Sequence, residues 1–228
     1  MQYENYIKDF PARCSTLLDK FEDQARLLEL DVTFLFSIAS VGLTIPIERL
    51  KKPYINEKEP DKNSTPHPAN DRDNYPNARD AMQNLRHKNF KRSELWDTTM
   101  QPWYYGRLSS TLGPPDAWPE LSELSKTSEV HSETTDCILN HIRNSLAHGN
   151  IYTSGNPIKK IIFLSELSTE KGKFNFLVIP LLGFSKFLRN WFAFINKLDI
   201  SQSPVQGVIY DDGQRDMRID LSHHGKAQ

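Results

Sequence analysis

The segment from His141 to Asn150 carries the side chains best suited to chemistry, because an arginine, an amide and a histidine gather near one predicted helix end. Histidine has an unperturbed pKa of about 6.5 and can therefore exchange protons near neutral pH. Arginine stays charged, and its planar fork of N–H groups matches the oxygens of a phosphate. Arg143, Asn144 and His148 are therefore the candidate catalytic residues.

The spacing of these residues predicts where they point. The core stripe predicted for this helix consists of Ile138, Ile142 and Leu146. At about 100° per residue, the three candidate side chains lie outside this stripe, but Arg143 and His148 are about 140° apart around the helix. That angle is too wide for both side chains to reach one small ligand easily. Two such helices across a two-fold axis would place the arginine of one copy near the histidine of the other. We therefore expect a homodimer with a composite cleft.

The pattern Arg143-Asn144-x-x-x-His148 resembles the Arg-x(4-6)-His motif of the HEPN superfamily of helical-bundle ribonucleases and toxins. The residue after the arginine is typically polar in that motif, and Asn144 conforms. The resemblance is best over residues 135–153 and weaker along residues 31–50. It does not extend to the proline-rich segment, the predicted hairpin or the C-terminal tail, which leaves the subfamily and the substrate open.

The resemblance implies a metal-independent endoribonuclease, without a cofactor, in which the 2′-hydroxyl of the RNA attacks and leaves a cyclic phosphate. His148 would exchange the proton, and Arg143 would stabilise the charge that grows on the phosphate. Asn144 would orient His148 or bind the phosphate. A toxin or antiphage-defence effector follows by resemblance, with an antitoxin or regulatory protein as a partner. The alternatives are a non-catalytic HEPN-like module that binds RNA, nucleotide or protein, and a helical scaffold that only dimerises through its Arg143 face.

The amino-acid composition limits which partners and which cellular compartment fit this chemistry. The chain has 228 residues, with 28 Lys and Arg against 29 Asp and Glu. A net charge of -1 gives no global attraction to nucleic acid or to an anionic membrane, so a polyanion site must be local. Cys14 and Cys137 lie far apart and outside any metal-ligand spacing, which favours a reducing compartment. The sequence therefore predicts a cytoplasmic protein with no metal site.

The densest local positive charge lies in the run from residue 86 to residue 92. Its candidate RNA-binding side chains are Arg86, Lys88, Lys91 and Arg92. The alternative is a solvated helix face, which is the usual role of such a run. The aromatic run from Trp103 to Tyr105 is more typical of packing than of base stacking.

The elements that position these residues read as an all-α fold: a HEPN-like helical bundle with a small β-hairpin insertion. Periodic apolar residues predict helices at residues 11–30, 31–47, 78–96, within 119–148, and at 181–198. We expect a single domain over residues 1–199 that includes a long polar loop at 52–77 and the hairpin at 157–180. The polar residues 200–228 are predicted to form a flexible tail.

The most apolar stretch, from Val32 to Ile47, is expected to be a buried helix at the centre of the bundle. It is shorter than the roughly 20 residues of a membrane span and is bounded by Asp31 and Glu48. The first nine residues lack the basic start and apolar core of a signal peptide. We therefore expect neither export nor a membrane partner.

Overall fold

The structure is a computed structural model of the chain. It describes residues 6–50, 75–108, 114–167 and 170–200, together with two short strands at 208–209 and 217–218. The predicted polar loop of residues 52–77 lies outside the described residues up to residue 74. The predicted tail of residues 200–228 also lies outside them, except for Ile200 and the two short strands.

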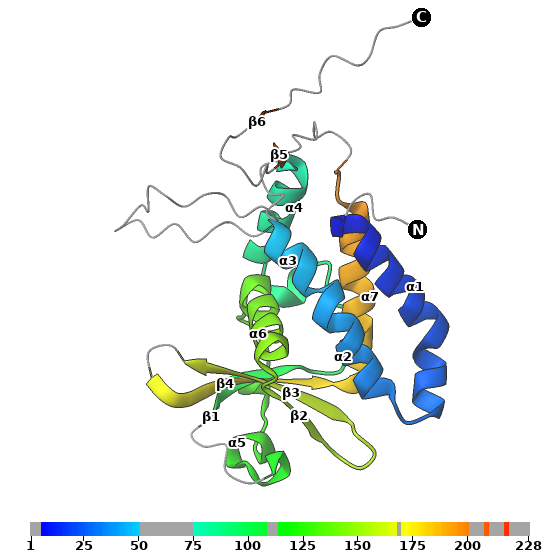
Figure 1. Ribbon diagram of the computed structural model, residues 1–228. Coiled ribbons are helices and arrows are strands. Elements are labelled where there is room, and N and C mark those ends of the chain that lie inside the picture. Colours follow the sequence, from blue (N-terminus) through cyan, green and yellow to red (C-terminus); the bar gives the residue numbers. More distant parts are fainter. Residues whose placement is uncertain are drawn as a thin grey trace, which may run out of the picture.

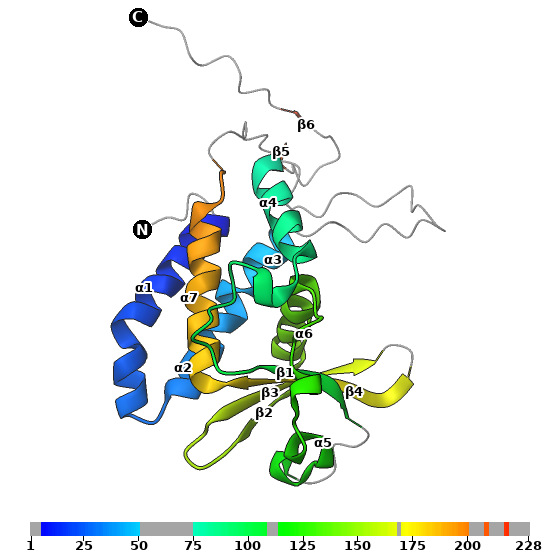
Figure 2. The same cartoon turned by 180° about the vertical axis from the view of Figure 1, so that it is seen from behind.

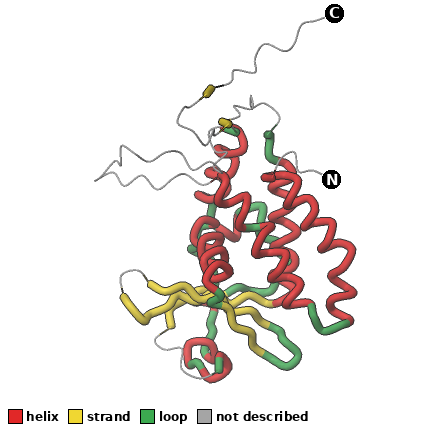
Figure 3. The backbone as a smooth tube through the Cα atoms, viewed as in Figure 1, coloured by secondary structure: helices red, strands yellow, loops and turns green. Residues whose placement is uncertain are grey.

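Six of the helices stand on one face of a four-stranded antiparallel sheet, and a short segment covers the other face (Figures 1 and 2). The helices are α1 (Tyr6–Leu27), α2 (Asp31–Gly42), α3 (Thr44–Leu50), α4 (Pro76–His87), α5 (Pro119–Ser122), α6 (Thr135–His148) and α7 (Leu181–Lys197). The strands are β1 (Tyr104–Leu108), β2 (Ile151–Ser154), β3 (Lys160–Leu167), β4 (Glu170–Pro180), β5 (Val208–Ile209) and β6 (Met217–Arg218). The sheet has the order β1-β4-β3-β2, and β5 pairs with β6 separately. Figure 3 shows the helices of the bundle in red against the yellow strands of the sheet.

The predicted all-α class is therefore correct only in part. The predicted hairpin exists as β3 and β4, but it is the central pair of a sheet and not a small insertion. Because a two-stranded hairpin alone is marginally stable, the flanking strands β1 and β2 contribute to its stability. β1 comes from the aromatic segment around Tyr104 and Tyr105, for which no strand was predicted. Its side chains alternate, with Tyr105 against the main core and Tyr104 and Leu108 against a second core.

The sheet buries both of its faces. Ile161, Phe163, Leu177 and Ile179 contact the main core under the helices, and Ile162, Leu164, Phe176 and Val178 form the second core with Trp118. These continuous apolar runs on β3 and β4 are typical of strands that are covered on both sides. The segment around α5 provides the second cover, so the molecule has three layers (Figure 1).

The central apolar segment is broken into α2 and α3, whereas the sequence predicted one helix. The break follows from Pro46, which has no N–H to donate to the carbonyl of Gly42, four residues earlier. The indole Nε1 of Trp191 donates to that carbonyl instead, at 3.0 Å. The segment Asp31–Leu50 is long and apolar enough to cross a membrane, with 39% of its most apolar window buried in the fold. Leu35, Ala39 and Ile47 are buried as predicted, but Val41 is exposed, so the segment is not enclosed on all sides.

The remaining helices depart from prediction mainly at their ends. α4 stops at His87, nine residues before the predicted end, because Lys88 is extended and residues 88–90 dock on the start of α6. The N–H of Thr135 donates to the carbonyl of Lys88 at 2.9 Å, and that of Phe90 donates to the carbonyl of Glu133 at 2.9 Å. Within residues 119–148 only α5 and α6 are α-helical. The final helix, α7, begins and ends close to its predicted bounds.

Candidate functional site

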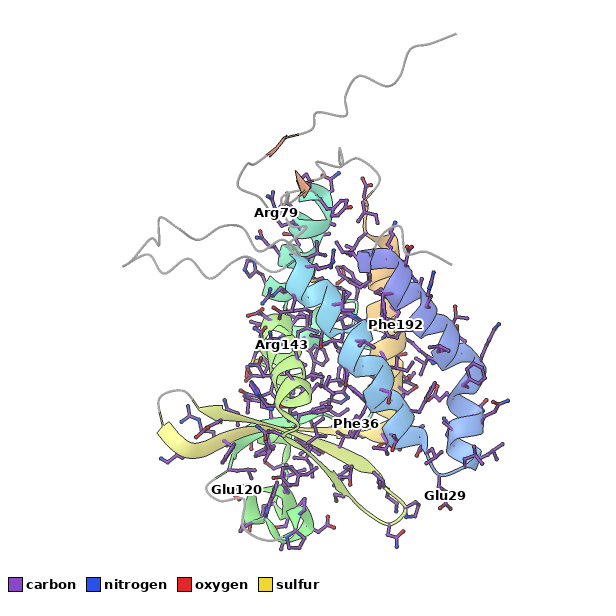
Figure 4. All side chains as sticks on the ribbon, viewed as in Figure 1. Glu29, Phe36, Arg79, Glu120, Arg143 and Phe192 are labelled. Atoms are coloured by element: carbon purple, nitrogen blue, oxygen red, sulfur yellow. The ribbon has the colours of Figure 1, made fainter. Side chains whose placement is uncertain are left out.

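Helix α6 carries all three candidate catalytic residues, and local interactions define both of its ends. Thr134 caps the start, because its hydroxyl accepts from the N–H of Cys137 at 3.2 Å. At the other end Gly149 adopts a left-handed conformation, with φ 69° and ψ 16°, and ends the helix at His148. The inner face of α6 includes the buried side chains Ile138 and Ile142. Arg143 lies about 100° round the helix from Ile142 and faces α3 (Figure 4).

Two hydrogen bonds join the end of α6 and the residue after Gly149 to strand β3, and a third closes the last turn of the helix. The Ser145 hydroxyl donates to the Leu164 carbonyl at 2.7 Å, and the Leu164 N–H donates to the Asn150 carbonyl at 2.9 Å. The Asn150 N–H donates back to the Ser145 carbonyl at 3.0 Å. These bonds enclose the last turn of the helix, so the backbone of His148 has a fixed position relative to β3.

The guanidinium of Arg143 is held from two sides. Its Nη1 donates to the amide oxygen of Asn144 at 2.7 Å. Its Nη2 forms an ion pair with the Oε1 of Glu48 on α3 at 2.6 Å, and this buried oxygen has no hydrogen-bond partner among the described residues. Its Nε is buried and has no hydrogen-bond partner among the described residues. Arg143, labelled in Figure 4, therefore joins α6 to α3.

His148 differs from Arg143 in being exposed. Its side chain forms no hydrogen bond, ion pair or ring contact with any residue that the structure describes. Asn144 contacts Arg143 and not His148, so the suggested orientation of His148 by Asn144 is not present in this arrangement. The structure thus brings Arg143 and Asn144 together and leaves His148 apart from both.

A second histidine on α6 has a structural role. His141 is buried, its Nε2 lies 2.9 Å from the carbonyl of Phe163, and its Nδ1 lies 2.9 Å from the hydroxyl of Ser165. Because a carbonyl can only accept, Nε2 carries the proton and the Ser165 hydroxyl donates to Nδ1. Burial lowers the pKa of His141 to about 4, although the hydrogen bond to Phe163 opposes this shift. The ring is therefore neutral near pH 7 and joins α6 to β3.

Sequence reasoning did not identify Glu48 as part of this site. The residue was notable only as the charge that ends the apolar stretch. Its role depends on where α3 passes α6, a contact between residues 95 positions apart that local spacing does not reveal. The one available signal was an acid directly after an apolar helix, which is too common to indicate a site.

The predicted RNA-binding cations are mostly engaged with other side chains. Arg86 forms an ion pair with Asp136, and Lys88 forms one with Glu94. Lys91 lies 3.3 Å from Glu129 and over the ring of Trp96. Arg92 is exposed, and its side chain forms no hydrogen bond or ion pair with a residue that the structure describes. The same run therefore contains three paired cations and one that is available.

Other candidate features lie away from α6 or have structural roles. Trp103 is buried, and its ring lies among those of Phe90, Trp96 and Phe187, which confirms packing for this aromatic. A cavity of about 250 Å³ lies on the far side of the sheet, lined in part by Asp116, Ser154 and Lys160. Within the described ranges, no three His, Cys, Asp or Glu side chains gather as metal ligands do.

Comparison with known proteins gives one match. A family model described as HEPN pEK499 p136 matches residues 1–202, a range that includes α6 and its motif. No curated protein and no solved structure matches the chain.

Proposed function

The chain belongs to the HEPN pEK499 p136 family, and from this premise we propose that it is an endoribonuclease that cleaves RNA without a metal ion. Membership alone supports the coarser statement of a ribonuclease-like, toxin-like or nucleotide-binding domain. The more specific proposal of a ribonuclease rests on the arrangement of Arg143 and His148 on α6. His148 is exposed and has no partner among the described residues, while Arg143 is fixed one to two turns earlier on the same helix.

Each residue type fits a step of the proposed reaction. The 2′-hydroxyl attacks the adjacent phosphate, a cyclic phosphate forms, and the bond to the 5′-oxygen breaks. His148 takes the proton of the hydroxyl or gives one to the leaving oxygen. Arg143 stabilises the charge that grows on the phosphate oxygens. Asn144, which accepts a hydrogen bond from Arg143, helps to set the direction of that guanidinium.

A second copy of the chain would complete the proposed site. Arg143 and His148 do not touch within one chain, and their positions on α6 are about 140° apart. Exposed apolar side chains on α2, which packs against α6, and on α1, which packs against α2, are available for association with a second copy. Among them, Leu17 and Phe21 are each 43% exposed and Val41 is 39% exposed. A two-fold axis would create two composite sites per dimer.

The same proposal gives the protein a cellular role. We infer that the protein acts in the cytoplasm on RNA, as a growth-arresting toxin or antiphage effector. An antitoxin or other regulatory protein would restrain such an activity until it is required.

A non-catalytic RNA- or nucleotide-binding module is the second candidate, and one observation favours it. Glu48 already forms an ion pair with Nη2 of Arg143, so the positive charge of Arg143 is partly neutralised before a phosphate binds. In this case the protein would bind RNA and leave it intact. RNA that is retained but not cut, in the presence or absence of divalent cations, would support the binding module.

The experiment that tests the proposed function is incubation of RNA with purified protein in EDTA. We expect the wild type to cut the RNA and His148→Ala to leave it intact with unchanged folding. The matched control is His87→Ala, which removes another exposed histidine from the last residue of a helix, α4, and should cut as the wild type does. Cleavage by His148→Ala at the wild-type rate would contradict the proposal.

A further inference from the structure

Arg143 can act on a phosphate only if its guanidinium points in one direction, and the structure assigns this task to Glu48. We propose that Glu48 is a positioning residue that holds Arg143 in the orientation that meets the substrate phosphate. The inference rests on the proposed ribonuclease function and adds to it a residue from a different helix.

The guanidinium of Arg143 has contacts at both of its terminal nitrogens. Asn144 approaches Nη1 at 2.7 Å and Glu48 approaches Nη2 at 2.6 Å, so the group is restrained at both terminal nitrogens. An arginine has five N–H groups, and these two contacts leave at least one N–H on each terminal nitrogen for a ligand. Two parallel N–H groups are what a phosphate accepts best.

The side chain of Arg143 is largely buried. The side chain of Arg143 is 25% exposed, and its Nε is buried without a hydrogen-bond partner among the described residues. An unpaired buried donor costs free energy, so the guanidinium does not adopt this position to satisfy its own hydrogen bonds. The attraction to Glu48 and the bond to Asn144 compensate for that cost and keep the group in place.

Glu48 lies on a helix that is held firmly by the core. Glu48 lies on the short helix α3, which is separate from α2 because Pro46 breaks the apolar segment. The α3 residues Ile47 and Leu50 on either side of it are buried in the main core, so its backbone has little freedom. An acid on a rigid element next to a flexible arginine is the arrangement that preorganises a catalytic cation.

Two other roles for Glu48, blocking Arg143 or only stabilising the fold, predict different results when Glu48 is replaced. If Glu48 merely blocked Arg143, its removal would free the cation and increase RNA cleavage. If Glu48 only stabilised the fold, its removal would lower the melting temperature and leave kcat of the folded protein unchanged. A positioning role requires a fall in kcat with little change in KM, because the lost interaction acts mainly in the transition state.

The test is Glu48→Gln, which keeps the size of the side chain and removes its charge. The matched control is Asp19→Asn, because Asp19 pairs with Arg189 between α1 and α7, outside the candidate site. With a short RNA, we expect Glu48→Gln to lower kcat by roughly 10- to 100-fold, with KM changed less than about threefold. Asp19→Asn should keep the wild-type kcat. An unchanged or increased kcat in Glu48→Gln would overturn the proposal.

A second measurement separates this inference from the proposed function. Nitrogen NMR of the arginine side chains reports rotation about the Nε–Cζ bond, and Arg143→Lys identifies the signal of Arg143. We expect restricted rotation in the wild type and in Asp19→Asn, and faster rotation in Glu48→Gln. If the wild type cuts no RNA, the proposed function fails, and this comparison still decides whether Glu48 holds Arg143. Freely rotating Nη groups in the wild type would overturn the inference.

Discussion

At the scale of single residues, the sequence correctly placed the arginine and the histidine away from the core face of one helix. Their positions follow from helical periodicity, which is local and therefore visible in the sequence. The partner of Asn144 could not be predicted, because the choice between Arg143 and His148 depends on rotamers. Glu48 was missed because its contact with Arg143 joins two helices far apart in the sequence.

His141 and His148 lie on one helix in different environments, since His141 is buried and His148 is exposed. The folded pKa of His141, about 4, lies below the value of about 6.5 expected in the unfolded chain. Between these values the unfolded chain binds a proton that the folded chain does not, so stability falls as the pH decreases from about 6.5 to about 4. The loss is roughly 2 to 3 kcal/mol over that window.

This prediction is tested by urea unfolding of the wild type and His141→Gln between pH 4.5 and 7.5. Glutamine does not titrate and can still donate to the Phe163 carbonyl. We therefore expect the wild type to lose stability relative to the variant as the pH decreases. Parallel stability curves would show that His141 does not couple folding to pH.

At the scale of elements, long amphipathic helices and the β3–β4 pair were predictable, whereas their neighbours were not. α6 and α7 have clear apolar stripes, and their ends match prediction because Gly149 and Pro180 are local signals. β1 was missed because its alternation is short and lies within a proline- and glycine-rich segment. The early end of α4 was missed because residues 88–90 dock on the start of α6, which is a tertiary contact.

Gly149 gives a direct test of how α6 ends. Its φ of +69° favours glycine, and a Cβ placed there would meet nothing within 4 Å. Substitution by alanine therefore adds backbone strain without a clash, and we expect Gly149→Ala to lose about 1 kcal/mol of stability. Gly149→Asn should lose less, because asparagine tolerates this conformation. Urea unfolding measures both values, and equal stability of all three proteins would argue against the left-handed cap.

The paired and free cations of residues 86–92 should behave differently on substitution. Arg86→Gln removes the ion pair that joins α4 to α6, so we expect a loss of roughly 1 kcal/mol of stability. Arg92→Gln should change stability by less than about 0.5 kcal/mol. If this run binds RNA, Arg92→Gln lowers the slope of RNA affinity against salt by about 1. These affinities are measured in the His148→Ala background, and an unchanged slope would place RNA elsewhere.

At the scale of the whole molecule, the separation of Arg143 from His148 is the reason why we propose a homodimer. Mixing Arg143→Ala with His148→Ala tests this arrangement. In a composite site, a mixed dimer has one doubly defective site and one intact site. Random pairing makes about half of the dimers mixed, so the mixture should recover about a quarter of the wild-type activity. Each variant alone should be inactive, and no recovery on mixing would show that both residues act within one chain.

The central claim is that the α6 motif directs attack by the 2′-hydroxyl of RNA, and the ends of the products test it most directly. A short labelled RNA is incubated in EDTA with the wild type, Arg143→Ala or His148→Ala, and the 3′ ends are identified. The account predicts cyclic phosphate ends from the wild type only, and no cleavage when the nucleotide before the cut carries a 2′-deoxy sugar. Cleavage of the 2′-deoxy substrate, or cyclic phosphate ends from either variant at the wild-type rate, would contradict it.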